Sequence, residues 1–237
     1  MNWSNWRQHF EDNVHRPLPE VAAPPLSQTQ HRALLQSLAR FQLGESGEGR
    51  IAHEIDRAEL PGIDGDYRIA LKRFIQEEGR HARILGTMVN ALGGRVLSRQ
   101  WSERLFVHAR RAFGVRFKLL VLLAAEVIGI GFYGMLADVL PAGLMAAALR
   151  QICGDEVAHL AFHRDFFHSQ RSTAVGALLR LLWWPLGSFA ALTVVWDHRA
   201  TLRAFEIPIG RAVSTLWAQV VAAGVTSASR PQPARAR

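Results

Sequence analysis

The sequence of 237 residues predicts an all-α protein, in which an antiparallel four-helix bundle is followed by additional C-terminal helices. Three observations predict this fold class. Apolar residues recur at helical spacing over long segments, whereas the alternation typical of β-strands is absent. Glycine and proline interrupt that spacing at short intervals, as expected for helices joined by tight loops. A Glu-x-x-His pattern also occurs twice within helix-patterned sequence.

The bundle is expected to occupy residues 27–170. Its four helices are expected, in chain order, over about 31–59, 65–92, 115–140 and 141–168. Ser27 is a candidate N-cap of the first helix, and Pro61-Gly62 ends that helix. Gly93-Gly94 is typical of a helix C-terminus, and Pro141 is typical of a helix start.

Both ends of the chain have a composition that differs from the bundle. Residues 1–26 are expected to form an extended N-terminal arm, because prolines recur in residues 11–26 and disfavour helix. Residues 227–237 are rich in Pro, Arg and Ala, so we expect a disordered basic tail there.

The segment 171–226 is expected to form apolar C-terminal helices. Its residues 175–196 are about as long as a membrane span, but Arg180 and Pro185 interrupt them, which favours two short helices packed on the bundle. The alternative is insertion into a membrane interface, with the tryptophans near the lipid headgroups. Those tryptophans are Trp183, Trp184 and Trp196.

Composition narrows the choice of compartment and partner. The formal net charge of +8 favours anionic lipid, an acidic partner or an anionic substrate. Nucleic acid is not an expected partner, because the basic residues are scattered and no nucleic-acid motif is present. The single cysteine, Cys153, excludes a disulfide framework and a Cys-x-x-Cys module. With no secretory signal at the N-terminus, we expect a cytoplasmic protein, or one peripheral to the inner membrane if the tail contacts lipid.

The residues that indicate chemistry are Glu78 and His81 in one motif, and Glu156 and His159 in the other. Residues three apart share a helix face, so each Glu and its His can bind one cation together. Each motif is preceded, thirty residues earlier, by another glutamate: Glu48 precedes Glu78 and Glu126 precedes Glu156. Helices joined by short loops run antiparallel, so that offset returns each glutamate to the same level of the bundle.

The setting of Glu126 independently favours a metal. It lies within the apolar run from Leu119 to Ile130, where an isolated carboxylate is costly unless it is paired. Four carboxylates and two neutral imidazoles around two divalent ions have zero total charge, which a low-dielectric core tolerates best. Mixed oxygen and nitrogen ligands with open positions suit Fe(II) or Mn(II) better than structural zinc.

This pattern resembles the ferritin-like superfamily of di-iron or di-manganese carboxylate proteins, over roughly residues 30–168. The resemblance implies a ferritin-like four-helix bundle with six metal ligands. They are Glu48, Glu78, His81, Glu126, Glu156 and His159. It further implies that Glu77 and Asp155, the acids before the ligand glutamates, hydrogen-bond the far nitrogen of a ligand histidine.

Three side chains remain open in this assignment. Glu45 competes with Glu48 as the first ligand, because it lies three residues earlier on the same face, although equal spacing favours Glu48. His163, one turn beyond His159, is a candidate seventh ligand by similarity to arylamine N-oxygenases of the superfamily. In those enzymes, however, the extra histidine precedes the ligand glutamate by one turn, so the position of His163 does not match theirs. Tyr133 lies two turns after Glu126 and either approaches the metals or packs in the core.

Within the superfamily, the resemblance implies a non-haem di-iron oxidase or monooxygenase of the ribonucleotide-reductase-like and oxygenase branch. Radical-storing subunits have a tyrosine four residues after the first ligand histidine, where this chain has Leu85. The implied partners are O2, a small apolar organic substrate and an external electron donor, with a homodimer as a further option. Two iron ions are the implied cofactors, with manganese or a mixed pair as alternatives. The alternative function is a non-catalytic or ferroxidase-type metal-binding protein that is associated with a membrane.

Overall fold

A computed structural model describes residues 2–46, 51–101 and 114–224, and these residues form helices without any strand. The helices are α1 (Trp3–Asn13), α2 (Gln28–Glu45), α3 (Ile51–Arg57), α4 (Gly65–Ala91), α6 (Val115–Val139), α7 (Leu144–Gln170), α8 (Ala174–Asp197), α9 (Arg199–Ala204) and α10 (Ile209–Ala222). The all-α prediction is therefore confirmed for the described part of the chain.

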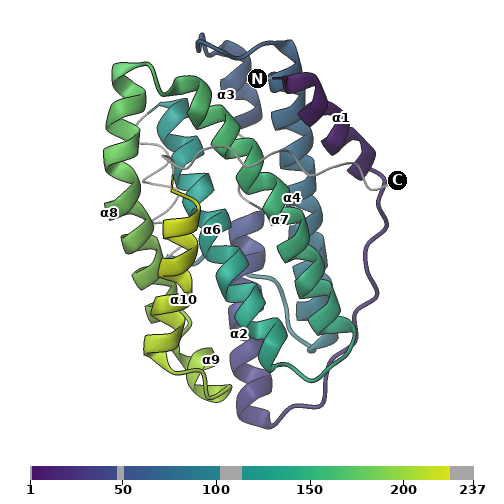
Figure 1. Ribbon diagram of the computed structural model, residues 1–237. Helices are drawn as coiled ribbons and strands as arrows, with labels where there is room; N and C mark the ends of the chain where they lie inside the picture. The colour runs from purple at the N-terminus through teal and green to yellow at the C-terminus, as the bar shows by residue number, and fades with distance from the viewer. Residues whose placement is uncertain (1, 47–50, 102–113, 225–237) are drawn as a thin grey trace.

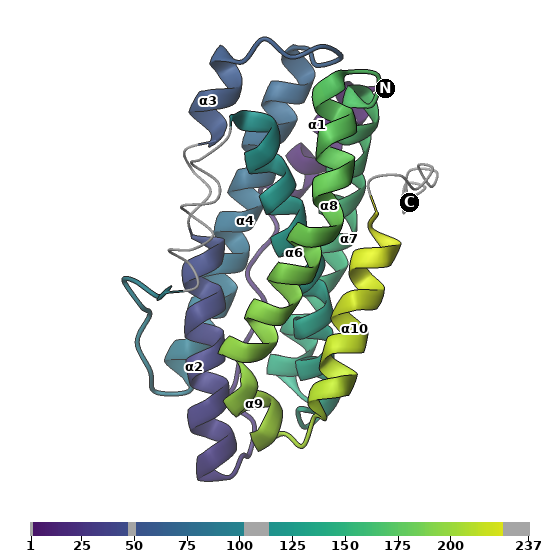
Figure 2. The same cartoon turned by 90° about the vertical axis from the view of Figure 1, so that its left-hand side faces the viewer.

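Helices α2, α4, α6 and α7 lie side by side along the length of the molecule (Figure 1). Helix α2 packs on α4, α6 packs on α7, and α4 meets α7. Helix α3 contacts α4 and α6, and Figure 2 shows it above α2 on the same side of the molecule. The buried side chains between these helices are mainly Leu and Ala, together with Phe and Ile, and they form one continuous core.

Local signals place the helix ends close to their predicted positions. Ser27 forms a capping box with Gln30, since the backbone N–H of Gln30 donates to Ser27 Oγ and the backbone N–H of Ser27 donates to Gln30 Oε1. Asp64 caps α4 by accepting from the Tyr67 N–H at 2.9 Å. Gly93 follows α4 with φ +69°, the left-handed conformation that favours glycine.

The first 13 residues differ from the prediction, because α1 is a helix where an extended arm was expected. Trp3, Trp6 and Phe10 recur at helical spacing, and all three are buried. Their rings pack edge-on against Phe162 of α7. The prolines that indicated an extended arm lie after α1, in residues 16–27, which have no regular secondary structure. The prediction thus holds only for that later part.

The expected first helix is present in two pieces, α2 and α3, and residues 47–50 between them lie outside the described residues. The prediction of two short helices in segment 175–196 is wrong, because α8 is one continuous helix that contains Pro185. Pro185 lies on the exposed side of α8, where its ring does not disturb packing on the bundle. The expected disordered tail, 227–237, also lies outside the described residues.

Two helices are long and apolar enough to cross a membrane, but they differ in burial. In α6, 83% of the apolar window is buried inside the protein, as expected for a core helix. In α8 the buried share is only 44%. Helix α10 packs against both, at Gly131 of α6 and Gly187 of α8, where an added Cβ would lie 2.6 Å from Leu216 and Val220 respectively.

Candidate metal centre

The two Glu-x-x-His motifs face each other from α4 and α7. Glu78, His81, Glu156 and His159 each offer a ligand atom, and these atoms all lie within 4.8 Å of one another. All four residues are at most 2% exposed, so the group is enclosed by protein. Figure 1 shows α4 and α7, the two helices that carry it.

Each histidine directs its Nδ1 atom toward the carboxylates. His81 Nδ1 lies 3.0 Å from Glu156 Oε1, and His159 Nδ1 lies 2.9 Å from Glu78 Oε1. Despite this proximity, Glu78 Oε1 and His81 Nδ1 have no partner in hydrogen-bonding geometry among the described residues. Atoms bound at about 2.1 Å to one cation, at right angles, are about 3 Å apart. The donor set and its spacing therefore fit a metal ion.

Two further glutamates approach this group from the other two long helices. Glu126 of α6 is buried, and its Oε2 lies 3.6 Å from His159 Nδ1. Glu45, the last residue of α2, lies near Glu78 and accepts a hydrogen bond from Tyr133 Oη at 2.6 Å. Glu48 lies outside the described residues, so the structure places Glu45 at the centre and leaves the position of Glu48 open.

The outer nitrogen of each histidine faces the acid of the opposite motif. His81 Nε2 lies 3.3 Å from Asp155 Oδ2, and His159 Nε2 lies 3.2 Å from Glu77 Oε2. A carboxylate on the outer nitrogen keeps a proton there and leaves Nδ1 free to bind a metal. The two motifs are therefore interlocked, since each supplies the acid that orients the histidine of the other.

Two arginines that the sequence analysis did not select hold these acids. Arg16 Nη1 lies 2.8 Å from Asp155 Oδ1, and Arg80 Nη1 lies 3.3 Å from Asp155 Oδ2. Arg80 also donates to the carbonyl oxygen of Pro17 at 2.7 Å, which fixes the segment that carries Arg16. Arg80 could have been found from the sequence, because it lies three residues after Glu77 on one helix face. No sequence signal marks Arg16.

In the absence of metal, protons held by some of the glutamates and by the histidines neutralise the charge of the centre. Burial and then the other carboxylates raise the pKa of Glu45 and of Glu126 well above 4.5. Burial and then the charge of Glu156 oppose ionisation of Glu78, but the nearby His159 and His81 outweigh both and lower the pKa of Glu78 to about 2.

The histidines complete this balance. Burial disfavours their charge, but Glu156 and the hydrogen-bonded acids outweigh burial and raise the pKa of His81 and His159 well above 6.5. Two imidazolium groups then neutralise two carboxylates, while the other two glutamates keep their protons. Divalent cations can replace all four protons without changing the total charge of the core.

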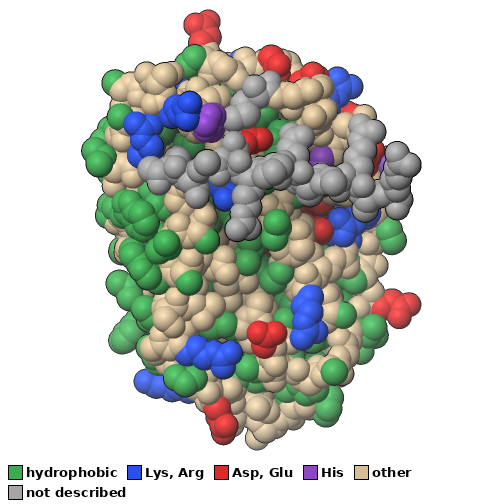
Figure 3. All heavy atoms as spheres, in the orientation of Figure 1, with side chains coloured by type: hydrophobic (Ala, Val, Ile, Leu, Met, Phe, Trp, Pro, Cys, Tyr) green, Lys and Arg blue, Asp and Glu red, His purple; other side chains and the backbone are tan. Residues whose placement is uncertain are grey.

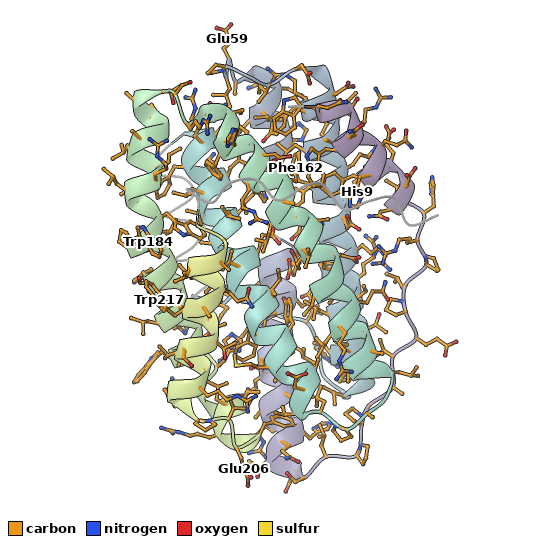
Figure 4. The ribbon with its side chains drawn as sticks, in the orientation of Figure 1. His9, Glu59, Phe162, Trp184, Glu206 and Trp217 are labelled. Atoms are coloured by element: carbon orange, nitrogen blue, oxygen red, sulfur yellow. The ribbon has the colours of Figure 1, made fainter. Side chains whose placement is uncertain are left out.

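An aromatic layer covers one side of the group. The His159 ring packs edge-on against Phe74, with ring centroids 4.8 Å apart, and lies 5.8 Å from Phe10 of α1. Figure 4 shows Phe162 and His9 in the same region, where α1 crosses α4 and α7. Phe10 was not expected at the centre, because the prolines after α1 had indicated an extended arm. These rings exclude water from the centre.

His163 lies in this aromatic layer and is fully buried, but it is outside the four-residue group. Its ring packs edge-on against Phe74, with centroids 5.0 Å apart. Neither ring nitrogen has a hydrogen-bond partner among the described residues. Burial, and then the charge of His159, lower the pKa of His163 to about 3, so this side chain is neutral.

No protein-family model, no curated protein and no solved structure matches this chain. The interpretation of the centre therefore depends on its own geometry and on the sequence pattern.

Proposed function

We propose that this chain is a di-metal carboxylate protein of the ferritin-like type, which binds two iron ions and uses O2 to oxidise a small apolar organic molecule. Manganese at one or both positions is compatible with the same ligands. The proposed ligands are two histidines and four carboxylates: Glu45, Glu78, His81, Glu126, Glu156 and His159.

The observation that supports this proposal most strongly is the interlocked pair of motifs. Both Nδ1 atoms point at shared carboxylates, and both Nε2 atoms face an acid from the opposite helix. A chance cluster of buried acids and histidines has no reason to repeat the outer contact in both halves. Zinc in a structural site favours four ligands around one ion, whereas six converging side chains with four carboxylates favour a pair of ions.

The protein side chains have separable tasks in this proposal. Glu78, Glu156, His81 and His159 would hold the ions, with Glu45 and Glu126 as further carboxylate ligands. Glu77 and Asp155 orient the histidines, and Arg16 and Arg80 compensate the charge of these two acids. Bound ferrous ions would supply the electrons that activate O2. The aromatic layer keeps water away from the oxidising centre.

Metal analysis after anaerobic purification tests the proposal. We expect about two equivalents of iron or manganese per chain, and a change in the optical spectrum when O2 is added. Glu78→Gln and Glu156→Gln should each lower the metal content strongly. Glu59→Gln is the matched control, because Glu59 is exposed at the end of the molecule (Figure 4) and should leave the metal content unchanged. Equal metal content in all four proteins would contradict the proposal.

The fate of labelled O2 and the amount of O2 consumed then distinguish an oxygenase from a protein that only binds or oxidises iron. With a chemical reductant and a panel of small apolar compounds, an oxygenase transfers an atom of 18O2 into a product. A ferroxidase consumes O2 only in proportion to added Fe(II), and a non-catalytic protein consumes none.

A further inference from the structure

Exposed apolar side chains gather on α8 and α10. Of seventeen large apolar side chains that are exposed among the described residues, ten belong to these two helices. In the space-filling view they form a green edge on the left, where Figure 1 places α8 (Figure 3). Isolated exposed apolar residues are ordinary, but a continuous patch indicates a contact surface.

The patch follows one face of α8. Its members recur at spacings of three, four or eight residues, so they point the same way along the helix. We call this face the apolar stripe and define it by Leu178, Leu181, Trp184, Leu192 and Trp196, together with Trp217 of α10. Trp184 and Trp217 lie side by side, with ring centroids 5.7 Å apart (Figure 4).

The charges around the stripe are mainly positive, with Glu206 as the one exposed acid of residues 171–224. Residues 171–224 contain five arginines, and their only acids are Asp197 and Glu206. Asp197 is buried and lies 3.3 Å from Arg40, so it does not offset the exposed arginines. The arginines flank both ends of α8 and the start of α10. They are Arg171, Arg180, Arg199, Arg203 and Arg211. The Arg199 guanidinium lies 4.2 Å from the centre of the Trp196 ring.

We propose that the apolar stripe docks this protein on the surface of an anionic phospholipid bilayer, with α8 parallel to the membrane plane. Leucine and tryptophan side chains enter the boundary between headgroups and acyl chains, and the flanking arginines bind lipid phosphate. The charge pattern favours lipid over a second copy of the chain, because a two-fold contact through α8 would place arginines against arginines.

The opposite face of α8 explains why the helix lies on the bilayer instead of crossing it. Leu179, Trp183 and Ala190 are buried against the bundle, and the Trp183 indole donates to the Val220 carbonyl oxygen of α10. Crossing would require all these contacts to break. Trp183 is thus a core residue, whereas Trp184 and Trp196 remain available to lipid. This inference does not depend on the metal centre.

Flotation with vesicles tests the proposal on the full chain. One set of vesicles is phosphatidylcholine alone, and the other contains one third phosphatidylglycerol. We expect the wild type to float with the anionic vesicles and less with the neutral ones, and high salt to weaken the anionic preference. The double variant Leu181→Glu with Leu192→Glu should bind at least about tenfold more weakly, since two apolar anchors are lost.

The matched control is Leu97→Glu with Leu144→Glu, which makes the same two changes at exposed leucines outside the stripe. It should float like the wild type, and circular dichroism verifies that both variants fold. The proposal is overturned if the wild type stays with the soluble fraction at both compositions, or if both double variants lose binding equally. It is also overturned if the wild type is a dimer that the stripe variant converts to monomers without any vesicle binding.

Discussion

At the scale of single residues, the least expected feature of the centre is the end of α2. Equal spacing favours Glu48 as the first ligand, but Glu45 lies near Glu78 and accepts a hydrogen bond from Tyr133, which brings Glu45 to the group of buried glutamates and histidines. Equal spacing assumes two identical helix pairs. Helix α2 ends at Glu45 with Ser46 as its C-cap, so the first pair does not repeat the regular second pair.

Glu45→Gln should therefore lower the bound metal from about two ions to about one per chain, because one outer carboxylate is lost. Glu48→Gln is the matched change three residues later and should leave the stoichiometry unchanged. Metal quantitation on both purified variants checks this expectation. If only Glu48→Gln loses metal, the first ligand is Glu48 and the equal-spacing prediction is right.

His163 is the second residue with an unusual environment. A buried polar group without a hydrogen bond lowers the stability of the fold by about 1–3 kcal/mol. Both ring nitrogens of His163 are buried without a hydrogen-bond partner among the described residues. We expect His163→Phe to raise the free energy of unfolding of the metal-free protein by about 1 kcal/mol, with unchanged metal content. Urea unfolding measures the first quantity and metal analysis the second. A loss of metal in this variant would instead identify His163 as a seventh ligand.

At the scale of elements, α9 is attached to α2 by a buried polar network. Ser37 Oγ lies 2.6 Å from both His198 Nδ1 and Thr201 Oγ1, and Thr201 donates to the Ala33 carbonyl oxygen. His198 also stacks on Phe41, with ring centroids 4.5 Å apart. His198 is buried, with only 4% of its surface exposed. The short helix α9 has little apolar area, so this network contributes much of its attachment.

This network should make stability depend on pH. Burial lowers the pKa of His198 to about 3, below its ordinary value of 6.5. Between these values the unfolded chain binds a proton that the folded chain does not, so stability falls as pH decreases through this window. The expected contribution is about 1.4 kcal/mol per pH unit.

Urea unfolding at pH values below 6.5 measures this dependence, with the ordinary histidine pKa as the upper limit of the window. His198→Gln should have a slope of stability against pH that is shallower by that amount. His15→Gln, at an exposed histidine, should keep the wild-type slope. Identical slopes in the three proteins would show that His198 does not titrate as its burial implies.

At the scale of the whole molecule, the proposed metal centre would couple the fold to metal binding. Its side chains come from α2, α4, α6 and α7, so the site exists only when these helices are assembled. A ligand that binds only the folded state stabilises it, by about 4 kcal/mol at a thousandfold excess over its dissociation constant. Removal of metal by a chelator should therefore lower the melting temperature, and added Fe(II) or Mn(II) should restore it.

Metal affinity should also rise with pH. The pKa values of Glu45, Glu126, His81 and His159 are all raised in the metal-free centre, so each group keeps a proton that metal must displace. Titration calorimetry in buffers with different ionisation enthalpies measures the protons released. Binding that is independent of pH and releases no protons would contradict the charge balance inferred for the centre.

The sequence by itself determined the helical class, most helix boundaries and the residues that face one another at the centre. Helical spacing, caps and Gly or Pro breaks are local, and the repeated offset between Glu126 and Glu156 reflects the regular geometry of adjacent antiparallel helices. Signals of this kind depend only on residues that are close together in the sequence. It therefore located Glu78, His81, Glu156 and His159 without knowledge of the packing.

Only the tertiary structure decided which distant segments complete the site. Arg16 reaches Asp155 from a stretch without regular structure, and α1 brings Phe10 to His159, because contacts over such separations leave no periodic signal. The structure likewise separated Trp183 from Trp184, since burial depends on what packs against a helix and not on its composition. Sequence spacing fixes the direction of a side chain on its own helix, whereas its surroundings depend on the assembled fold.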